Sequence, residues 1–165
     1  MTQTRPEVAT DSRTRPGGAD PSLLAELDGL DQLQAMVQGV APRPPIMETL
    51  GFTDFRPERG RVVVEMPAAE FHYNPLGSVH GGVICTLLDT AAGCAVHSTL
   101  AVGEAYTSLD LTAKFLRPVT VDSGLLRCEG SLIQRGRRTA LAESKLYNGA
   151  GQLVAYATTS CMIFS

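Results

Sequence analysis

The feature that most constrains the fold is a long apolar segment, residues 82–100. Asp89 is the only charged residue in it, and also the only one between Glu70 and Glu104. The neighbours of Asp89 are apolar or small on every side, which is typical of a helix buried in a protein core or spanning a membrane. The segment approaches membrane length, but it holds several polar residues and stands alone between a glycine-rich turn and amphipathic strands. We therefore expect a buried central helix.

The chain after this helix is expected to form strands only. In residues 108–115, apolar and polar residues alternate with the period of a half-buried strand. Further strands are expected over residues 125–134, 139–147 and 153–164, with a hairpin at residues 148–151 because Asn and Gly tolerate positive φ. One apolar helix followed by antiparallel strands predicts an α+β fold in which the sheet wraps around the helix.

The N-terminal part of the chain divides into a tail and a helix. Residues 1–20 are polar and lack the apolar stretch of a secretory signal, so we expect a disordered tail. Residues 21–45 are expected to form an amphipathic helix, weakened by Gly29, and a proline-rich linker. The main domain covers residues 46–165.

Two short strands are expected to open the main domain. They lie near residues 50–55 and 61–66, and the turn between them contains Pro57 and Gly60.

Composition excludes several classes of function. A net charge of −3, the absence of Trp and an aromatic content of 5% give no reason to expect nucleic-acid binding. The four cysteines are widely spaced and have no histidine at metal-ligand spacing, so we expect no metal site. We expect them to be reduced thiols in a cytoplasmic protein.

Asp89 calls for an explanation because burial penalises a charged carboxylate. It is either a structural group, bonded to backbone or an arginine, or a catalytic group in a partly dry cleft. Its position within the helix argues against a role in capping.

The residues before the helix favour the catalytic interpretation. Asn74, Gly77, His80, Gly81 and Gly82 lie where the N–H groups of a helix start lack intrahelical partners and can stabilise an oxyanion. Adjacent glycines let a ligand approach the backbone closely. A substrate carbonyl and the carboxylate two turns later are then expected to share one groove.

The combined pattern resembles a known family. Asn74, the run His80-Gly81-Gly82 and Asp89 have the spacing of the PaaI-like, 4-hydroxybenzoyl-CoA thioesterase-related group of hotdog-fold thioesterases. Residues 108–118 and 148–155 resemble later parts of that group, and the resemblance covers roughly residue 45 to the C-terminus. It implies an acyl-CoA substrate, no cofactor besides the CoA of the substrate, and an active site built from two subunits.

The resemblance also implies a role for each residue. The Gly81 N–H would polarise the thioester carbonyl, and Asp89 would act as nucleophile or as general base on water. Asn74 would position the water or the thioester, and His80 would support the turn or bond to the carbonyl. Ser108 would supply a hydroxyl from the neighbouring subunit.

One position departs from part of the family. Some relatives carry Ser or Thr one turn after the catalytic carboxylate, where this chain has Gly93. The hydroxyl role is therefore expected to fall to Ser108.

A basic turn is the last candidate site. Arg135, Arg137 and Arg138 form either a solvated hairpin or a binding site for the CoA phosphates, and both interpretations stay open. Gly82 is expected to let the substrate approach the backbone.

The sequence thus predicts an acyl-CoA thioesterase acting on a medium-chain or aromatic acyl group. A non-catalytic acyl-CoA sensor on the same scaffold is the main alternative. An enoyl-thioester hydratase is disfavoured, because His72 and Gly77 stand where its Asp-x-Asn-Pro-x-His pattern has Asp and His. A curled sheet leaves an open edge, so we expect a homodimer or homotetramer.

Overall fold

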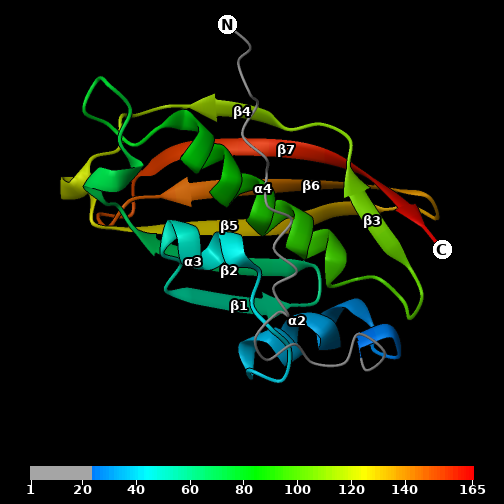
Figure 1. The fold of residues 1–165 in the computed structure, drawn as a ribbon. Coiled ribbons are helices and arrows are strands. Elements are labelled where there is room, and N and C mark those ends of the chain that lie inside the picture. Colours follow the sequence, from blue (N-terminus) through cyan, green and yellow to red (C-terminus); the bar gives the residue numbers. More distant parts are fainter. Residues whose placement is uncertain (1–23) are drawn as a thin grey trace, which may run out of the picture.

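The computed structural model describes residues 24–165, and the expected tail and the expected helix start near residues 20–22 lie outside this range. Seven antiparallel strands form one curled sheet with the order β1-β2-β5-β6-β7-β3, and β4 also pairs with β7 (Figure 1). The strands are β1 (Asp54–Glu58), β2 (Arg61–Pro67), β3 (Ala105–Ser108), β4 (Thr112–Phe115), β5 (Leu125–Arg135), β6 (Thr139–Tyr147) and β7 (Leu153–Phe164). The helices are α2 (Gly29–Val37), α3 (Pro45–Leu50), α4 (Gly81–His97) and two 3-10 turns, η1 (Glu70–His72) and η2 (Val121–Ser123).

The predicted central helix is α4, which lies across the inner face of the sheet (Figure 1). Leu87, Leu88 and Ala91 are fully buried on it. The helix lies so close to β5 that a Cβ on Gly130 would sit 2.0 Å from the Ala91 carbonyl oxygen. This confirms the predicted α+β fold with a sheet wrapped around one helix.

The prediction that the central helix is buried on all sides is wrong for the single chain. Gly82 and Asp89 are exposed and Thr86 is half-buried, so one face of the helix is left uncovered by the described residues. Within residues 24–165, no helix is both long and apolar enough to cross a membrane.

The strand expected over residues 108–115 is in fact two strands. Ser108 pairs with Cys161 and Thr112 with Thr158, so three residues of this segment face two residues of β7. The extra residue forms a bulge that Asp110 stabilises, because its Oδ1 accepts the Ser160 N–H at 3.1 Å.

The expected N-terminal helix is interrupted: Leu24 and Ala25 are helical, residues 26–28 are not, and α2 begins at Gly29. Asp28 caps it by accepting the Asp31 N–H at 3.0 Å. The Gly29 N–H donates to the Leu100 carbonyl at 2.9 Å, and a Cβ on Gly29 would lie 1.8 Å from the His97 carbonyl oxygen. Gly29 is therefore the point where α2 docks onto the end of α4.

The first strand also starts later than expected. Residues 45–50 form α3, which ends at Gly51 with a φ of 72°, and the strand occupies residues 54–58. Pro57 lies inside β1, where Pro is tolerated because β1 is an edge strand of the described sheet. Of the two residues expected in the turn, Gly60 lies in it and Pro57 does not.

Candidate active site

His80 organises the start of α4. Its Nδ1 accepts the Gly82 N–H at 2.8 Å, and its carbonyl oxygen accepts the N–H groups of Val83 and Ile84 at 2.9 and 3.3 Å. Of the first four N–H groups of α4, only that of Gly81 has no hydrogen-bond partner among residues 24–165. The Gly82 N–H, in contrast, is already used by the cap.

A pocket of about 350 Å³ opens beside Gly81. It is mostly apolar and is lined by Asn74, Ser78, Val79, Gly81, Ile84, Phe115, Leu116, Arg117, Pro118 and Val119. The Phe115 ring would lie 3.3 Å from a Cβ on Gly81, so a glycine keeps the wall of the pocket close to the unpartnered N–H.

Asn74 lines this pocket, but its side chain also holds the preceding loop together. Its Oδ1 accepts the Leu76 N–H at 2.8 Å, and its Nδ2 donates to Ser78 Oγ at 3.1 Å. Gly77 completes the turn with a φ of 78°. One hydrogen of the Asn74 Nδ2 has no partner within the described chain and is available to a ligand.

Asp89 lies on the uncovered face of α4, where its Oδ1 accepts a hydrogen bond from Ser108 Oγ at 3.3 Å. Neither Lys nor Arg pairs with Asp89 within residues 24–165, so the predicted alternative of an arginine partner is not met. This contact lies within one chain, and the expectation that the neighbouring subunit supplies a Ser108 hydroxyl to the cleft stays a prediction.

The nearby thiols are poor nucleophiles. Burial, and secondarily the charge of Asp89, raises the pKa of Cys94 to about 12. The same two causes raise the pKa of Cys85. Both thiols stay protonated near neutral pH, so neither offers a thiolate on this face of the helix.

The structure does not bring Gly81 and Asp89 to one groove within a single chain. They are eight residues apart on α4, which is about 12 Å along the helix axis. Asp89 is not among the residues that line the pocket beside Gly81. One thioester carbonyl cannot touch both groups of the same chain.

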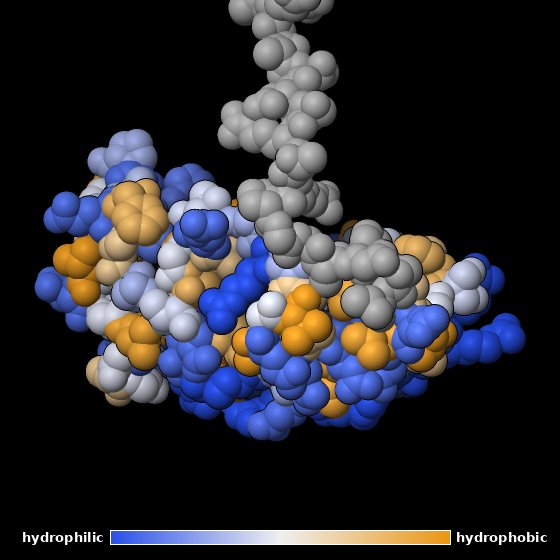
Figure 2. All heavy atoms as spheres, turned by 60° about the horizontal axis from the view of Figure 1, so that its bottom comes forward, coloured by the Kyte–Doolittle hydropathy of each residue, from blue (hydrophilic) through white to orange (hydrophobic). Residues whose placement is uncertain are grey.

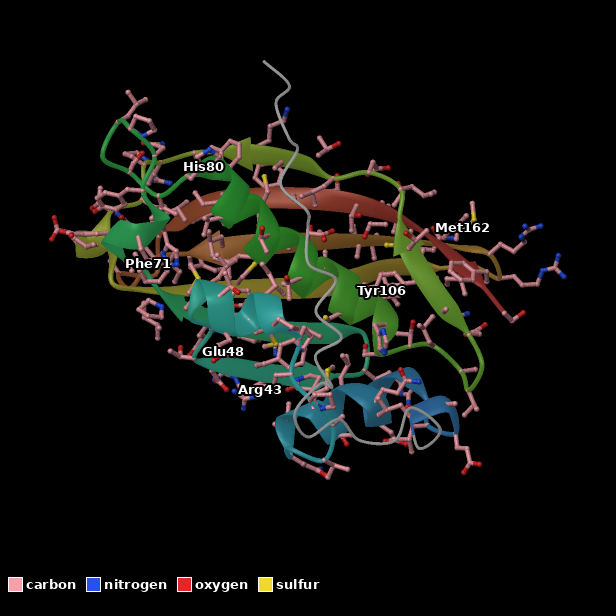
Figure 3. All side chains as sticks on the ribbon, viewed as in Figure 1. Arg43, Glu48, Phe71, His80, Tyr106 and Met162 are labelled. Atoms are coloured by element: carbon pink, nitrogen blue, oxygen red, sulfur yellow. The ribbon has the colours of Figure 1, made fainter. Side chains whose placement is uncertain are left out.

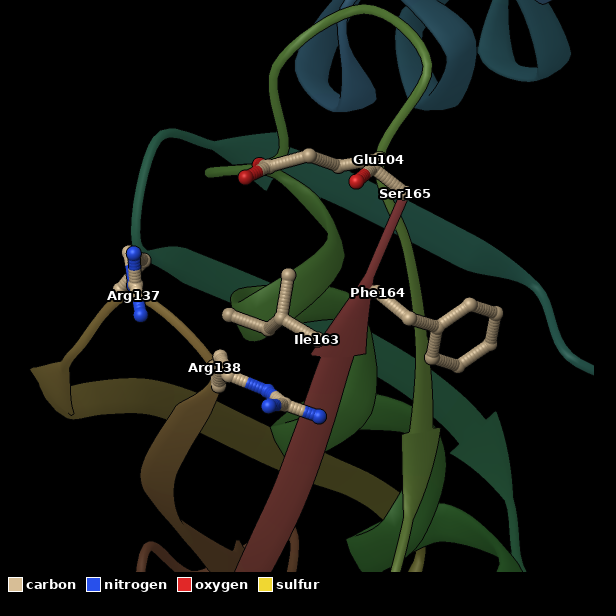
Figure 4. A pocket seen from close by; sticks show the side chains of 6 residues that line it. All are labelled: Glu104, Arg137, Arg138, Ile163, Phe164 and Ser165. Atoms are coloured by element: carbon tan, nitrogen blue, oxygen red, sulfur yellow. The ribbon is translucent and has the colours of Figure 1, made fainter.

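The basic turn is divided between two environments. Arg135 forms an ion pair with Glu104, whereas Arg137 and Arg138 are exposed. The two exposed arginines line a pocket of about 390 Å³ together with Glu104, Ile163, Phe164 and Ser165 (Figure 4).

Tyr106 is a residue that the sequence prediction missed. Its hydroxyl lies 2.7 Å from the place where a Cβ on Gly93 would sit, one turn after Asp89. Side chains two residues apart on a strand point to the same face. Tyr106 therefore shares the face of Ser108 on β3, and this strand pattern could have added it to the candidates.

No group of three or more His, Cys, Asp or Glu side chains that could hold a metal ion occurs in residues 24–165.

Comparison with known proteins identifies the family. The thioesterase superfamily model matches residues 76–155. A phenylacetic acid degradation-related protein from Ralstonia eutropha, a solved structure, is 34% identical with a TM-score of 0.71, and the match covers 79% of this chain and 98% of that chain. The 1,4-dihydroxy-2-naphthoyl-CoA hydrolase of Listeria monocytogenes is 27% identical over 109 residues, 66% of this chain and 87% of that protein.

Human acyl-coenzyme A thioesterase 13 is 29% identical over 97 residues, which is 58% of this chain and 68% of that protein. The curled antiparallel sheet around α4 is thus the hotdog fold that the sequence predicts. The chain belongs to the thioesterase superfamily.

Proposed function

We propose that this protein hydrolyses acyl-CoA thioesters, with Asp89 as general base. The observation that carries the proposal is the exposed carboxylate of Asp89, oriented by Ser108 and free of any cationic partner within the described residues. Asp89 takes a proton from a water molecule while the water oxygen bonds to the thioester carbon. The carbon–sulfur bond then breaks and the CoA thiolate leaves with its electron pair, to be protonated by solvent.

The oxyanion in this proposal is stabilised by Gly81. Its N–H is unpartnered within residues 24–165 and lies at the positive end of α4, where a developing negative charge is favoured. The second Asn74 Nδ2 hydrogen adds a donor from the same pocket.

The active site in this proposal combines two copies of the chain. The gap of about 12 Å between Gly81 and Asp89 is too long for one carbonyl, but a second copy can bring its own Gly81 to Asp89 of the first. His80 and Tyr106 lie toward opposite ends of α4 in Figure 3. In the proposed site, the His80 end of α4 in one copy would meet the Asp89 and Tyr106 side of α4 in the other copy.

The sheet edges favour one side for that contact. The β1 edge carries ion pairs of Arg56 and Arg61 with acidic residues, a charge pattern that discourages strand pairing. Apolar side chains are interspersed with polar ones on the face of the molecule seen in Figure 2. Near β4, Leu109, Phe115 and Leu116 are all about half exposed, so we place the second copy there. We propose a homodimer, which can double to a homotetramer.

The two ends of the substrate would lie in different pockets. The apolar pocket beside Gly81 suits a medium-chain or aromatic acyl group, and the Listeria relative is named for an aromatic acyl-CoA. Arg137 and Arg138 offer two exposed guanidinium groups to the CoA phosphates. A cytoplasmic location stays a prediction.

A matched pair of variants at Gly81 tests the oxyanion role. Gly81→Pro removes the N–H and little else, because Pro is favoured at the first helical position and His80 already has an extended ψ of 135°. Gly81→Ala is the control, since it adds the same Cβ beside Phe115 but keeps the N–H. With a panel of acyl-CoAs and a thiol-release assay, Gly81→Pro is expected to lower kcat roughly 100-fold or more relative to Gly81→Ala.

Asp89→Asn tests the base. It is expected to remove turnover and to keep acyl-CoA binding, because the Ser108 contact survives. If the wild type binds acyl-CoAs but releases no thiol from any of them, the protein is a sensor and the hydrolase proposal is wrong.

A further inference from the structure

Two hydroxyl groups of β3 face α4, one at the exposed Asp89 and one at the buried Gly93. Ser108 reaches Asp89, and Tyr106 reaches Gly93. The spacing of the two strand residues, about 7 Å, matches one helical turn of about 5.4 Å closely enough for both contacts to form. The Tyr106 hydroxyl therefore lies at the helix position one turn after Asp89, on the side away from Gly81.

The position of the Tyr106 hydroxyl depends on Gly93. At a distance of 2.7 Å, a Cβ at residue 93 would collide with the hydroxyl, so glycine admits the hydroxyl where any other residue would force it to shift. Cβ positions one turn apart on a helix are about 5–6 Å from each other. A single water molecule can bridge a hydroxyl at Gly93 and a carboxylate at Asp89.

The Tyr106 ring packs against His97 at the end of α4, and His97 in turn contacts Gln32 of α2. His97 packs edge-on against Tyr106, with the ring centres 5.7 Å apart. Gln32 donates its amide hydrogens to the carbonyls of Leu24 and Leu27, so its Oε1 must accept the proton on His97 Nε2, 3.0 Å away. This chain of contacts fixes the tyrosine in one orientation.

The hydroxyl itself is available. It makes no hydrogen bond within the part of the chain that the structure describes, unlike Ser108. Burial raises the pKa of Tyr106 well above its ordinary value, and the charge of Asp89 adds to the effect. The phenol stays protonated near neutral pH and can donate a hydrogen bond.

We propose that Tyr106 is a positioning residue that donates a hydrogen bond to the hydrolytic water of Asp89, and that Gly93 exists to admit its hydroxyl. The inference rests on the proposed thioesterase function. The water gives one hydrogen to Asp89 and accepts the Tyr106 O–H, which leaves one lone pair free to attack the thioester carbon.

The test compares kcat and KM for Tyr106→Phe, Gly93→Ser and the double variant, with melting temperature as a check on folding. Tyr106→Phe is expected to lower kcat roughly 10- to 100-fold and leave KM within about twofold, because a misplaced reactant loses rate and not affinity. Gly93→Ser alone is expected to be impaired by the collision with Tyr106. In the double variant the serine hydroxyl takes the vacated place, so kcat is expected to recover at least in part.

Each outcome bears on one proposal. A wild type that releases no thiol overturns the thioesterase function itself. With an active wild type, full kcat in Tyr106→Phe overturns the role of Tyr106, as does a change in KM alone. A folded double variant that is no faster than Tyr106→Phe also overturns it, because the hydroxyl would then not be the missing group.

Discussion

His80 acts on the site through the backbone that it caps. Its Nδ1 holds the Gly82 N–H, and a neutral ring then carries its proton on Nε2. His80→Ala is expected to lower the free energy of unfolding by about 1 kcal/mol and to lower kcat, because the first turn loosens. Asn is also a good cap, so His80→Asn is expected to restore both quantities. Chemical denaturation and thiol release measure them. A stable but inactive His80→Asn would instead assign a direct role to Nε2.

Two buried serines make opposite contributions to stability. Among residues 24–165, Ser144 Oγ is buried without a hydrogen-bond partner, whereas Ser98 Oγ donates to the Ala95 carbonyl and accepts the Gly60 N–H, both at 2.8 Å. Ser144→Ala is expected to raise the free energy of unfolding by about 1 kcal/mol, since it removes an unsatisfied polar group. Ser98→Ala, the matched control, is expected to lower it by about 1–3 kcal/mol because Gly60 loses its acceptor. If both substitutions changed the free energy of unfolding in the same direction, this account would be contradicted.

At the scale of elements, the contact between α2 and α4 makes stability depend on pH. Burial lowers the pKa of His97 below its ordinary value of 6.5. The unfolded chain therefore binds a proton before the folded one does, and stability is lost as the pH falls below about 6.5. The melting temperature of the wild type is expected to drop between pH 7 and pH 5, and less so for His97→Gln. An unchanged slope in His97→Gln would place the titrating group elsewhere.

The elements that the sequence predicts best are those whose pattern depends on burial alone. The limits of β6 and β7 are confirmed, because their alternation follows the inner and outer faces of the sheet and the Asn148–Gly151 turn separates them. The central helix is confirmed for the same reason. Its exposed face was missed, because the residues there are as small or apolar as those in the core.

The elements that the sequence predicts poorly depend on contacts between distant residues. The helix α2 begins later than expected, at Gly29, where Asp28 caps it and α4 lies against it, and Asp110 splits one expected strand by bonding to Ser160 of β7. The strand alternation can place Tyr106 on the same face as Ser108, but the Tyr106–Gly93 contact was missed because it joins a strand to a helix, which no local pattern encodes. The roles of the motif residues stay predictions, and the expected groove shared by Gly81 and Asp89 is not formed within one chain because eight residues of α4 separate them.

At the scale of the whole molecule, one edge of the sheet is available for a second copy. Among the described strands, β4 pairs only with β7, and its neighbours Leu109 and Leu116 are about half exposed. Lys substitutions at these two positions are expected to shift the protein toward monomers, because charge on an edge strand opposes pairing. Sedimentation or light scattering measures the mass. If the doubly substituted protein keeps the mass of the wild type, the interface lies elsewhere.

A mixture of two inactive variants decides whether the site is shared between copies. In a dimer of Asp89→Asn with Gly81→Pro, a shared site pairs Gly81 of one chain with Asp89 of the other. One site of each mixed dimer then carries both substitutions and the other carries neither. Random reassociation of equal amounts is expected to restore about a quarter of the wild-type kcat, since half of the dimers are mixed and each has one intact site. A mixture of Gly81→Ala with Asp89→Asn, treated in the same way, is expected to keep about half of the wild-type kcat whether or not the chains exchange, so it controls for activity lost during the treatment. If the site lay within one chain, every site in the first mixture would keep one lesion and the mixture would stay inactive.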